Sequence, residues 1–166
     1  MEWHISNNYM EDLIMNSRFV NTYVLNILKL HGWYEDRKIN ISQWIKILGE
    51  EGYVCFDYAI EVMQSLGGIS VNVDGNSEYM GAQFDFDPVG AGSGEYDRLA
   101  NFELYAKESL YPVAYTACGI IYVGESKNVY GGNWKEFYWD GNNIEDYLNR
   151  TFVDKLFQEI KILFRR

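Results

Sequence analysis

Hydrophobic residues recur with helical spacing in three segments of the first half of the chain, residues 17–33, 40–52 and 56–68. Apolar positions every three or four residues form one buried stripe on each helix. The stripe positions are Phe19, Val20, Tyr23, Val24, Ile27, Leu28 and Leu30, then Trp44, Ile45 and Leu48, then Ala59, Val62, Met63 and Leu66. The pattern therefore predicts three amphipathic helices.

Capping residues mark where these helices begin and end. Gly32 suits the left-handed position after the first helix, and glycines also follow the other two. Asn40 with Gln43 three residues later fits a capping box, and Ile39 and Trp44 fit a hydrophobic staple. The second helix is therefore expected to begin at Asn40.

The period changes to two after the third helix. Apolar residues alternate over residues 69–73, which is typical of a strand. A second strand follows, in which Phe84 and Phe86 share one face while Asp85 and Asp87 share the other. Two paired strands with one apolar face are therefore expected here.

A glycine-rich stretch, residues 87–94, reads as a loop, and residues 95–109 read as a further helix. The inward positions of that helix are expected to be Tyr96, Leu99, Phe102 and Ala106. Residues 110–142 are rich in β-branched and aromatic residues broken by glycines, which predicts a strand meander.

The chain is expected to close with a long helix capped by Asn142 or Asn143. This helix should bury Ile144, Tyr147, Leu148, Phe152 and Leu156. Helices, then strands, then a helix predict one α+β domain over residues 1–166 with a mainly antiparallel sheet. The first 16 residues read as a possible N-terminal extension.

The charge restricts the class of partner. The 166-residue chain carries a formal net charge of −10. Such a protein is repelled by nucleic-acid phosphates, whereas a basic protein partner would be attracted to it. No signal peptide and no apolar stretch long enough to span a membrane is visible, so a cytoplasmic location is expected. Cys55 and Cys118 both lie in apolar sequence and are expected to be buried, reduced thiols.

The sequence offers no organised set of catalytic residues, metal ligands or cofactor-binding residues. His4 and His31 lie in unrelated settings, and neither a phosphate-binding loop nor a dinucleotide fingerprint is present. The carboxylates that flank the glycine-rich stretch are Asp85, Asp87, Glu95 and Asp97. Acidic loop residues are mostly solvated or turn-forming, but they also suit partner contact or, less often, metal binding or catalysis.

The most aromatic tract covers residues 131–143. In a strand, Trp134, Glu136 and Tyr138 would share one face, and Phe137 and Trp139 the other. One face should be core. The face with Trp134, Glu136 and Tyr138 either packs against a second layer or forms a partner-binding surface.

The order of short motifs resembles the SUKH-superfamily immunity proteins, and the third immunity subgroup fits best. The matching motifs are Gly32-Trp33 with Arg37, Leu66-Gly67-Gly68, Asp87-Pro88 with Ala91, Leu110-Tyr111-Pro112, Val129-Tyr130 and Gly141-Asn142-Asn143. The sequence departs from the pattern at Val113-Ala114, where an isoleucine–glycine pair is usual.

The resemblance implies a single α+β domain with a curved sheet flanked by helices. It also implies an immunity protein of bacterial polymorphic toxin systems, which binds one cognate toxin domain, often a nuclease, and blocks it. Such a protein is not an enzyme and has no catalytic residues to carry over. Two alternatives are a regulatory interaction domain of the wider superfamily and a hydrolase that uses the acidic loop.

Overall fold

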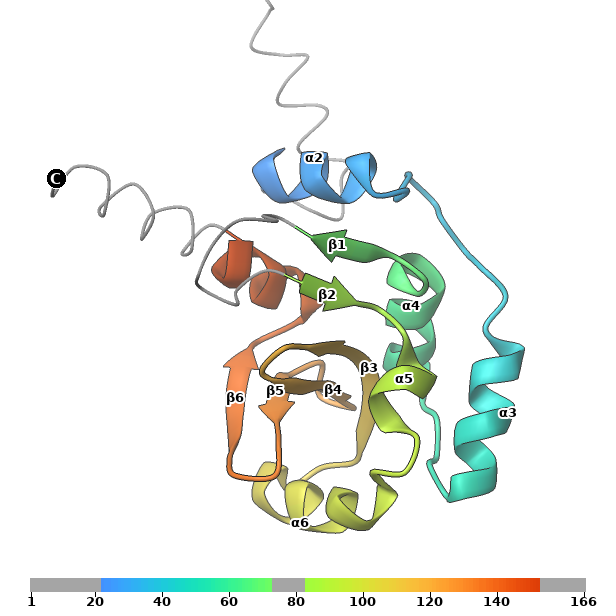
Figure 1. The fold of residues 1–166 in the computed structure, drawn as a ribbon, viewed down its shortest axis with the longest axis vertical. Coiled ribbons are helices and arrows are strands. Elements are labelled where there is room, and N and C mark those ends of the chain that lie inside the picture. The colour runs from blue at the N-terminus through green and yellow to red at the C-terminus, as the bar shows by residue number, and fades with distance from the viewer. Residues whose placement is uncertain (1–21, 73–82, 153–166) are drawn as a thin grey trace, which may run out of the picture.

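A six-stranded antiparallel sheet forms the centre of the computed structural model, which describes residues 22–72 and 83–152 (Figure 1). The strands follow one another across the sheet in chain order. They are β1 (Ser70–Asn72), β2 (Gln83–Asp85), β3 (Leu110–Thr116), β4 (Gly119–Gly124), β5 (Val129–Gly132) and β6 (Phe137–Gly141). Strands β3 to β6 are the predicted meander, in which each strand pairs with the next through a short turn.

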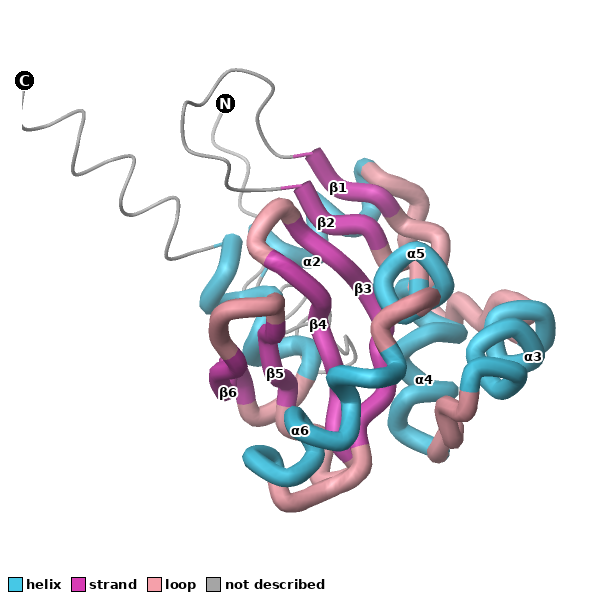
Figure 2. The backbone as a smooth tube through the Cα atoms, turned by 60° about the horizontal axis from the view of Figure 1, so that its bottom comes forward, coloured by secondary structure: helices cyan, strands magenta, loops and turns pink. Residues whose placement is uncertain are grey.

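Six helices pack around the sheet in the described residues. They are α2 (Thr22–Leu30), α3 (Ser42–Glu51), α4 (Asp57–Leu66), α5 (Pro88–Gly92), α6 (Tyr96–Ala106) and a closing helix over residues 144–152. Figure 2 shows α5 and α6 in front of the sheet, whereas α2 and the closing helix lie behind it. The order of helices and strands confirms the predicted α+β class with an antiparallel sheet.

Aromatic contacts join both helical layers to the sheet. Behind it, the ring of Phe84 lies 5.9 Å from Tyr147 and 5.2 Å from Phe152, measured between ring centroids. In front, Phe102 of α6 lies 5.6 Å from Tyr122 and stacks on Phe137 at 4.7 Å. Large rings bury the most apolar area per side chain, so these contacts are central to the stability of the fold.

The helical periodicity predicted most of the buried positions correctly. All four stripe residues of α4 are buried, and so are Val24, Ile27 and Leu28 of α2. The closing helix buries four of the predicted residues, Ile144, Tyr147, Leu148 and Phe152. The expected burial of Leu156 lies outside the described residues, as do Phe19 and Val20. Three residues were predicted to face inward and are exposed instead, namely Tyr23, Leu30 and Tyr96.

Two local predictions are wrong because short-range hydrogen bonds decide the backbone. Residues 88–92 form the short helix α5 rather than a loop, because Asp87 caps it by accepting from the Gly90 N–H at 2.9 Å. Pro88 then occupies the first helical turn, where its missing N–H costs nothing. Helix α3 begins at Ser42, because the Asn40 side chain accepts from the Ser42 N–H and turns the chain before the helix.

The shape of the sheet and the length of the last helix differ from the expectation. The sheet is not strongly curled, although the resemblance implied a curved one. The closing helix is described for residues 144–152 only, and the expected continuation lies outside the described residues. Asn143 rather than Asn142 caps it, since the Asn143 Oδ1 accepts from the Asp146 N–H at 2.7 Å.

Glu108 links the end of α6 to the β4–β5 turn and should make stability depend on pH. Its carboxylate accepts from the Tyr130 hydroxyl at 2.6 Å and from the Ser126 N–H at 2.7 Å. Burial raises the pKa of Glu108, but these hydrogen bonds outweigh burial and hold that pKa below its ordinary value. A carboxyl group whose pKa is lower in the folded state stabilises the fold at pH values above its pKa in the unfolded state, about 4.3. This stabilisation is lost as the pH falls through the pKa of the folded state.

We therefore expect Glu108→Gln to lower the free energy of unfolding by about 1 kcal/mol at pH 7, because one acceptor of a partly solvated cluster is weakened. The difference between variant and wild type should shrink between pH 5 and about pH 3. Urea denaturation at a series of pH values measures it. If the difference in free energy of unfolding stays constant with pH, Glu108 does not have a lowered pKa in the folded protein.

Candidate partner-binding surface

The first pair of predicted carboxylates, Asp85 and Asp87, lies near the Tyr115 side chain. Asp85 accepts from the Ser70 hydroxyl at 2.5 Å and from the Gln83 side-chain amide at 3.3 Å. The negative charge of Asp85, with smaller effects of burial and Asp87, raises the pKa of Tyr115. Asp87 also caps α5, so it has a structural role in addition to any contact with a partner.

The second pair, Glu95 and Asp97, lies at the start of α6. Glu95 pairs with Arg98 at 3.2 Å. Burial, and then the nearby carboxylates of Glu51, Glu95 and Asp97, raises the pKa of Tyr53. The two acidic pairs are therefore separated by the length of α5, and the four carboxylates do not converge on one point.

Trp134 and Glu136 lie in the β5–β6 turn and not in the strand, so their predicted shared strand face is wrong. Asn133 organises the turn: its Oδ1 accepts from the Lys135 N–H at 2.8 Å and from the Glu136 N–H at 3.1 Å. Asn and Asp side chains favour such turns over a continuing strand. Trp134 is 74% exposed, and the Lys135 ammonium lies 4.6 Å from its ring centre.

Tyr138 and Trp139 follow in β6, and both are partly exposed. Tyr138 covers Gly131 so closely that a Cβ there would lie 2.5 Å from its ring. Trp139 is 45% exposed, although it was expected on the same face as Phe137, which packs against the core. A register shift between Val129 and Tyr130 interrupts the regular alternation along β5 and β6.

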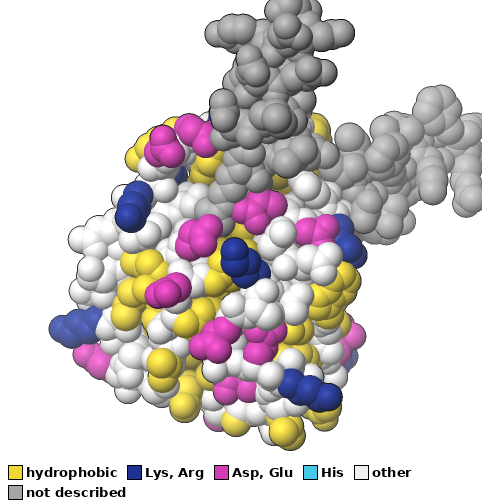
Figure 3. All heavy atoms as spheres, turned by 180° about the vertical axis from the view of Figure 1, so that it is seen from behind, with side chains coloured by type: hydrophobic (Ala, Val, Ile, Leu, Met, Phe, Trp, Pro, Cys, Tyr) yellow, Lys and Arg dark blue, Asp and Glu magenta, His cyan; other side chains and the backbone are white. Residues whose placement is uncertain are grey.

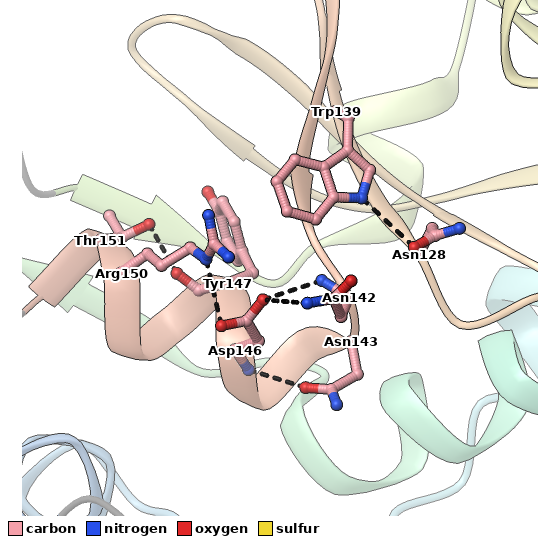
Figure 4. Close-up of polar contacts among 8 residues, drawn as sticks. All are labelled: Asn128, Trp139, Asn142, Asn143, Asp146, Tyr147, Arg150 and Thr151. Atoms are coloured by element: carbon pink, nitrogen blue, oxygen red, sulfur yellow. Dashed lines mark hydrogen bonds and ion pairs between the residues drawn. The ribbon is translucent and has the colours of Figure 1, made fainter.

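Sequence reasoning missed Arg150, which lies over the Trp139 ring with its guanidinium 4.7 Å from the ring centre (Figure 4). The same guanidinium pairs with Asp146 at 3.1 Å, and the Trp139 indole N–H donates to Asn128 at 3.2 Å. The (i, i+4) spacing of Asp146 and Arg150 was the available signal, but it does not reveal contact with a distant strand.

Strand pairing places Asp85 and the aromatic turn at the same level of the sheet. The aligned positions are Asp85 with Tyr115, Tyr115 with Ile120, Ile120 with Gly132 and Gly132 with Phe137. Three strand spacings separate β2 from β5, which is about 14 Å. The structure thus brings Trp134, Glu136 and Tyr138 together in one hairpin, with the carboxylates arranged at a distance.

Acidic side chains are not confined to the predicted loop. Figure 3 shows the face opposite the view of Figure 1, where Asp and Glu side chains are scattered among apolar patches and a few Lys and Arg. The sequence contains 24 acidic and 14 basic residues. Because the charge is spread out, attraction of a basic partner would come from the whole protein more than from one patch.

The motifs Gly32-Trp33 and Arg37 have structural roles. Trp33 is buried, and its indole N–H donates to the Ser65 hydroxyl at 3.2 Å. The Arg37 guanidinium donates to the carbonyls of Ser65 at 2.7 Å and Gly67 at 2.8 Å, which lie at the end of α4. A shallow pocket of about 440 Å³ lies beside Arg37, but the guanidinium is already held by these carbonyls.

Metal-binding clusters and membrane-spanning helices are both absent from the described ranges. No group of three or more His, Cys, Asp or Glu side chains that could hold a metal ion occurs there. No helix in those ranges combines the length and apolarity needed to cross a membrane. Both cysteines are free; Cys55 is half-buried, while Cys118 is exposed, which corrects the expectation of two buried thiols.

In the described residues, the sequence motifs maintain the scaffold and aromatic side chains project from one hairpin. The model of the SUKH-3 immunity protein family matches residues 20–153. The chain therefore belongs to the SUKH-3 immunity protein family, as its motifs indicated, and membership implies neutralisation of a cognate toxin. Such proteins are typically non-enzymatic. The searches of curated proteins and of solved structures found no match.

Proposed function

We propose that this protein protects its cell by binding a basic toxin domain, for which a nuclease is one candidate, and blocking it in the cytoplasm. The observation that carries the proposal is the family match over most of the described chain. The formal net charge of −10 supports a basic partner, because opposite net charges speed encounter between two proteins. A toxin domain that acts on nucleic acid needs basic residues to bind phosphates, so it fits this charge.

The proposed contact surface combines the acidic residues around α5 with the aromatic turn, namely Asp85, Asp87, Glu95, Asp97, Trp134, Glu136 and Tyr138. The exposure of Trp134 supports this choice, since exposed aromatic side chains are enriched among residues that dominate binding energy. Asp85 lies about three strand spacings from the hairpin that bears Trp134, so the carboxylates would steer the partner more than hold it.

Measurement of association rate against ionic strength with the toxin domain encoded by the adjacent gene tests this function. We expect association to slow markedly as salt rises, because the Debye length shortens from about 10 Å at 0.1 M to about 3 Å at 1 M. Replacing Asp85, Glu95 and Asp97 with Asn or Gln should slow association with little change in dissociation. Asp87 is left intact because it caps α5.

Trp134→Ala should instead speed dissociation, and Tyr105→Ala serves as the matched control. Tyr105 is 75% exposed on α6 and lies outside the proposed surface. If the toxin domain encoded by the adjacent gene fails to bind and the cells are not protected, the proposed function is wrong. A flat salt profile with unaffected variants would remove this surface while leaving the immunity function intact.

A further inference from the structure

The pocket of about 440 Å³ beside Arg37 lies where the segment between α2 and α3 passes the end of α4 (Figure 1). Hydrogen bonds join its two walls: the Arg37 guanidinium and the Ile39 N–H both donate to carbonyl groups of α4. Binding pockets of proteins commonly have volumes of about 300–1,000 Å³. This pocket can therefore receive a side chain or a small molecule.

The lining of the pocket carries an excess of negative charge. Three carboxylates, Glu35, Asp36 and Glu61, line it together with two cations, Arg37 and Lys38. The Arg37 guanidinium is already directed at the carbonyls at the end of α4. Within the described part of the chain, neither Glu35 nor Asp36 has an ion pair or a side-chain hydrogen bond. Both carboxylates can therefore accept hydrogen bonds from a cationic group in the pocket.

The backbone at Asp36 has a conformation that few residues adopt. Asp36 has a φ of 60°, in the left-handed region, where Asp and Asn are the side chains tolerated best after glycine. Behind it, the Trp33 indole N–H donates to the Ser65 hydroxyl at 3.2 Å, so the wall of the pocket is fixed. A carboxylate placed on a fixed wall loses little conformational entropy when a ligand binds.

The chemistry of the lining favours a guanidinium group as the occupant. Arginine donates two parallel hydrogen bonds to carboxylates, and it is enriched among interface residues that fill pockets. Tyr34, which directly precedes the lining carboxylates, is 58% exposed, and the faces of aromatic rings attract cations.

The charges of the chain favour a different protein over a second copy as the source of this group. Two copies, each with a formal net charge of −10, repel one another. The arginines of the described residues, Arg37, Arg98 and Arg150, all have partners within their own chain. A basic toxin domain has the opposite net charge and brings its own arginine side chains.

We infer that this pocket receives an arginine side chain of the cognate toxin domain, with its guanidinium bound by Glu35 and Asp36. This inference rests on the proposed function and deepens it. The pocket adjoins the strand end that bears the first acidic pair, because the Gly68 N–H, just after the carbonyl that Arg37 holds, donates to the Phe86 carbonyl at 2.7 Å. The contact surface thereby extends from Asp87 to the pocket.

Neutral variants of the two carboxylates test the assignment with the full chain and the toxin domain encoded by the adjacent gene. Asp36→Asn and Glu35→Gln should each raise the Kd about tenfold, because a close ion pair is lost. Glu125→Gln is the matched control: Glu125 is exposed in the β4–β5 turn, and the change in net charge is the same. Its Kd should change less than about twofold.

Asp36→Asn should keep the midpoint of urea denaturation, since Asn tolerates the same backbone conformation. If the wild type binds the toxin domain and both carboxylate variants bind equally well, the inference is wrong and the immunity function stands.

Lys38→Ala should act in the opposite direction. Its ammonium is the lining cation that opposes an incoming guanidinium, so its removal should lower the Kd about twofold or more at low salt. Lys46→Ala, at an exposed position of α3, is the control for the change in net charge. Equal effects of the two lysine variants would contradict a cation in this pocket.

Methylguanidinium serves as a direct probe of the free chain. In nuclear magnetic resonance spectra, the backbone amides of residues 35–38 should shift and saturate in the wild type but not in Asp36→Asn. Equal shifts in both proteins would overturn the site. Saturable binding of methylguanidinium, combined with an unchanged Kd of the variants for the toxin domain, would show that the pocket takes a free small cation and would overturn the assignment to the toxin.

The oligomeric state supplies the last outcome. Analytical ultracentrifugation should give a monomer for the free chain, because like net charges oppose pairing of two copies. A dimer that dissociates in Asp36→Asn would show that a second copy supplies the cation, and would overturn the inference. If the toxin domain encoded by the adjacent gene does not bind at all, and cells are not protected, the proposed function fails together with this inference.

Discussion

Replacing Phe84 with alanine is expected to lower the free energy of unfolding by about 3–5 kcal/mol, the usual cost of removing a large buried ring. Phe84 is 1% exposed, and its ring contacts both Tyr147 and Phe152 of the closing helix. The substitution would leave a cavity where this helix packs on the sheet. Since whole domains are stable by only about 5–15 kcal/mol, the variant should be close to the limit of folding at 37 °C.

Urea denaturation followed by circular dichroism measures the loss. Leu104→Ala is the matched control, because Leu104 is 75% exposed and should change stability by less than about 0.5 kcal/mol. Phe84→Leu should recover much of the stability by filling most of the cavity. A loss below about 1.5 kcal/mol for Phe84→Ala would mean that the closing helix contributes little to the core.

Arg37→Ala is expected to lower the free energy of unfolding by about 2–3 kcal/mol, since it removes two charge-assisted hydrogen bonds to carbonyls at the end of α4. Burial lowers the pKa of the guanidinium from its ordinary value, which agrees with a partly desolvated group. The loss of a positive charge at a helix C-terminus adds to the effect.

Arg37→Lys separates charge from geometry. A lysine ammonium keeps the charge but cannot reproduce the fork that spans the carbonyls of Ser65 and Gly67, so stability should fall by about 1 kcal/mol. Lys38→Ala, at an exposed neighbouring position, is the control for general charge effects. Equal stability of Arg37→Ala and Lys38→Ala in urea denaturation would contradict the structural role of Arg37.

The elements that were predicted well are those whose burial follows from periodicity alone. In α4 and the closing helix, every described stripe position is buried, because each helix presents one continuous apolar face to the sheet. Simple alternation likewise predicted the burial of Phe84 in β2 and of Phe86 just after it. The resemblance to the family rested on motifs that include Asn143 and Arg37, and in this chain both serve the fold, Asn143 as a helix cap and Arg37 through its guanidinium contacts.

The features that were missed depend on contacts between distant residues or on competing local hydrogen bonds. Nothing in the spacing of Trp139 and Arg150 indicates that the chain brings one over the other. The turn at Asn133 and the register shift in β5 change which aromatic side chains are exposed, and alternation cannot predict either. Helix α5 was missed because a glycine-rich segment has low helix propensity, which the Asp87 cap and its packing overcome.

The exposed thiol of Cys118 gives the protein a natural position for a spectroscopic label. Its carbonyl accepts from the Asn133 side chain at 3.0 Å, so the β3–β4 turn adjoins the hairpin that bears Trp134 and Trp139. Burial raises the pKa of the half-buried Cys55 thiol, and maleimides react with the thiolate. A single fluorophore can therefore be attached beside the aromatic hairpin without engineering the sequence, where the arrival of a protein partner would change its emission.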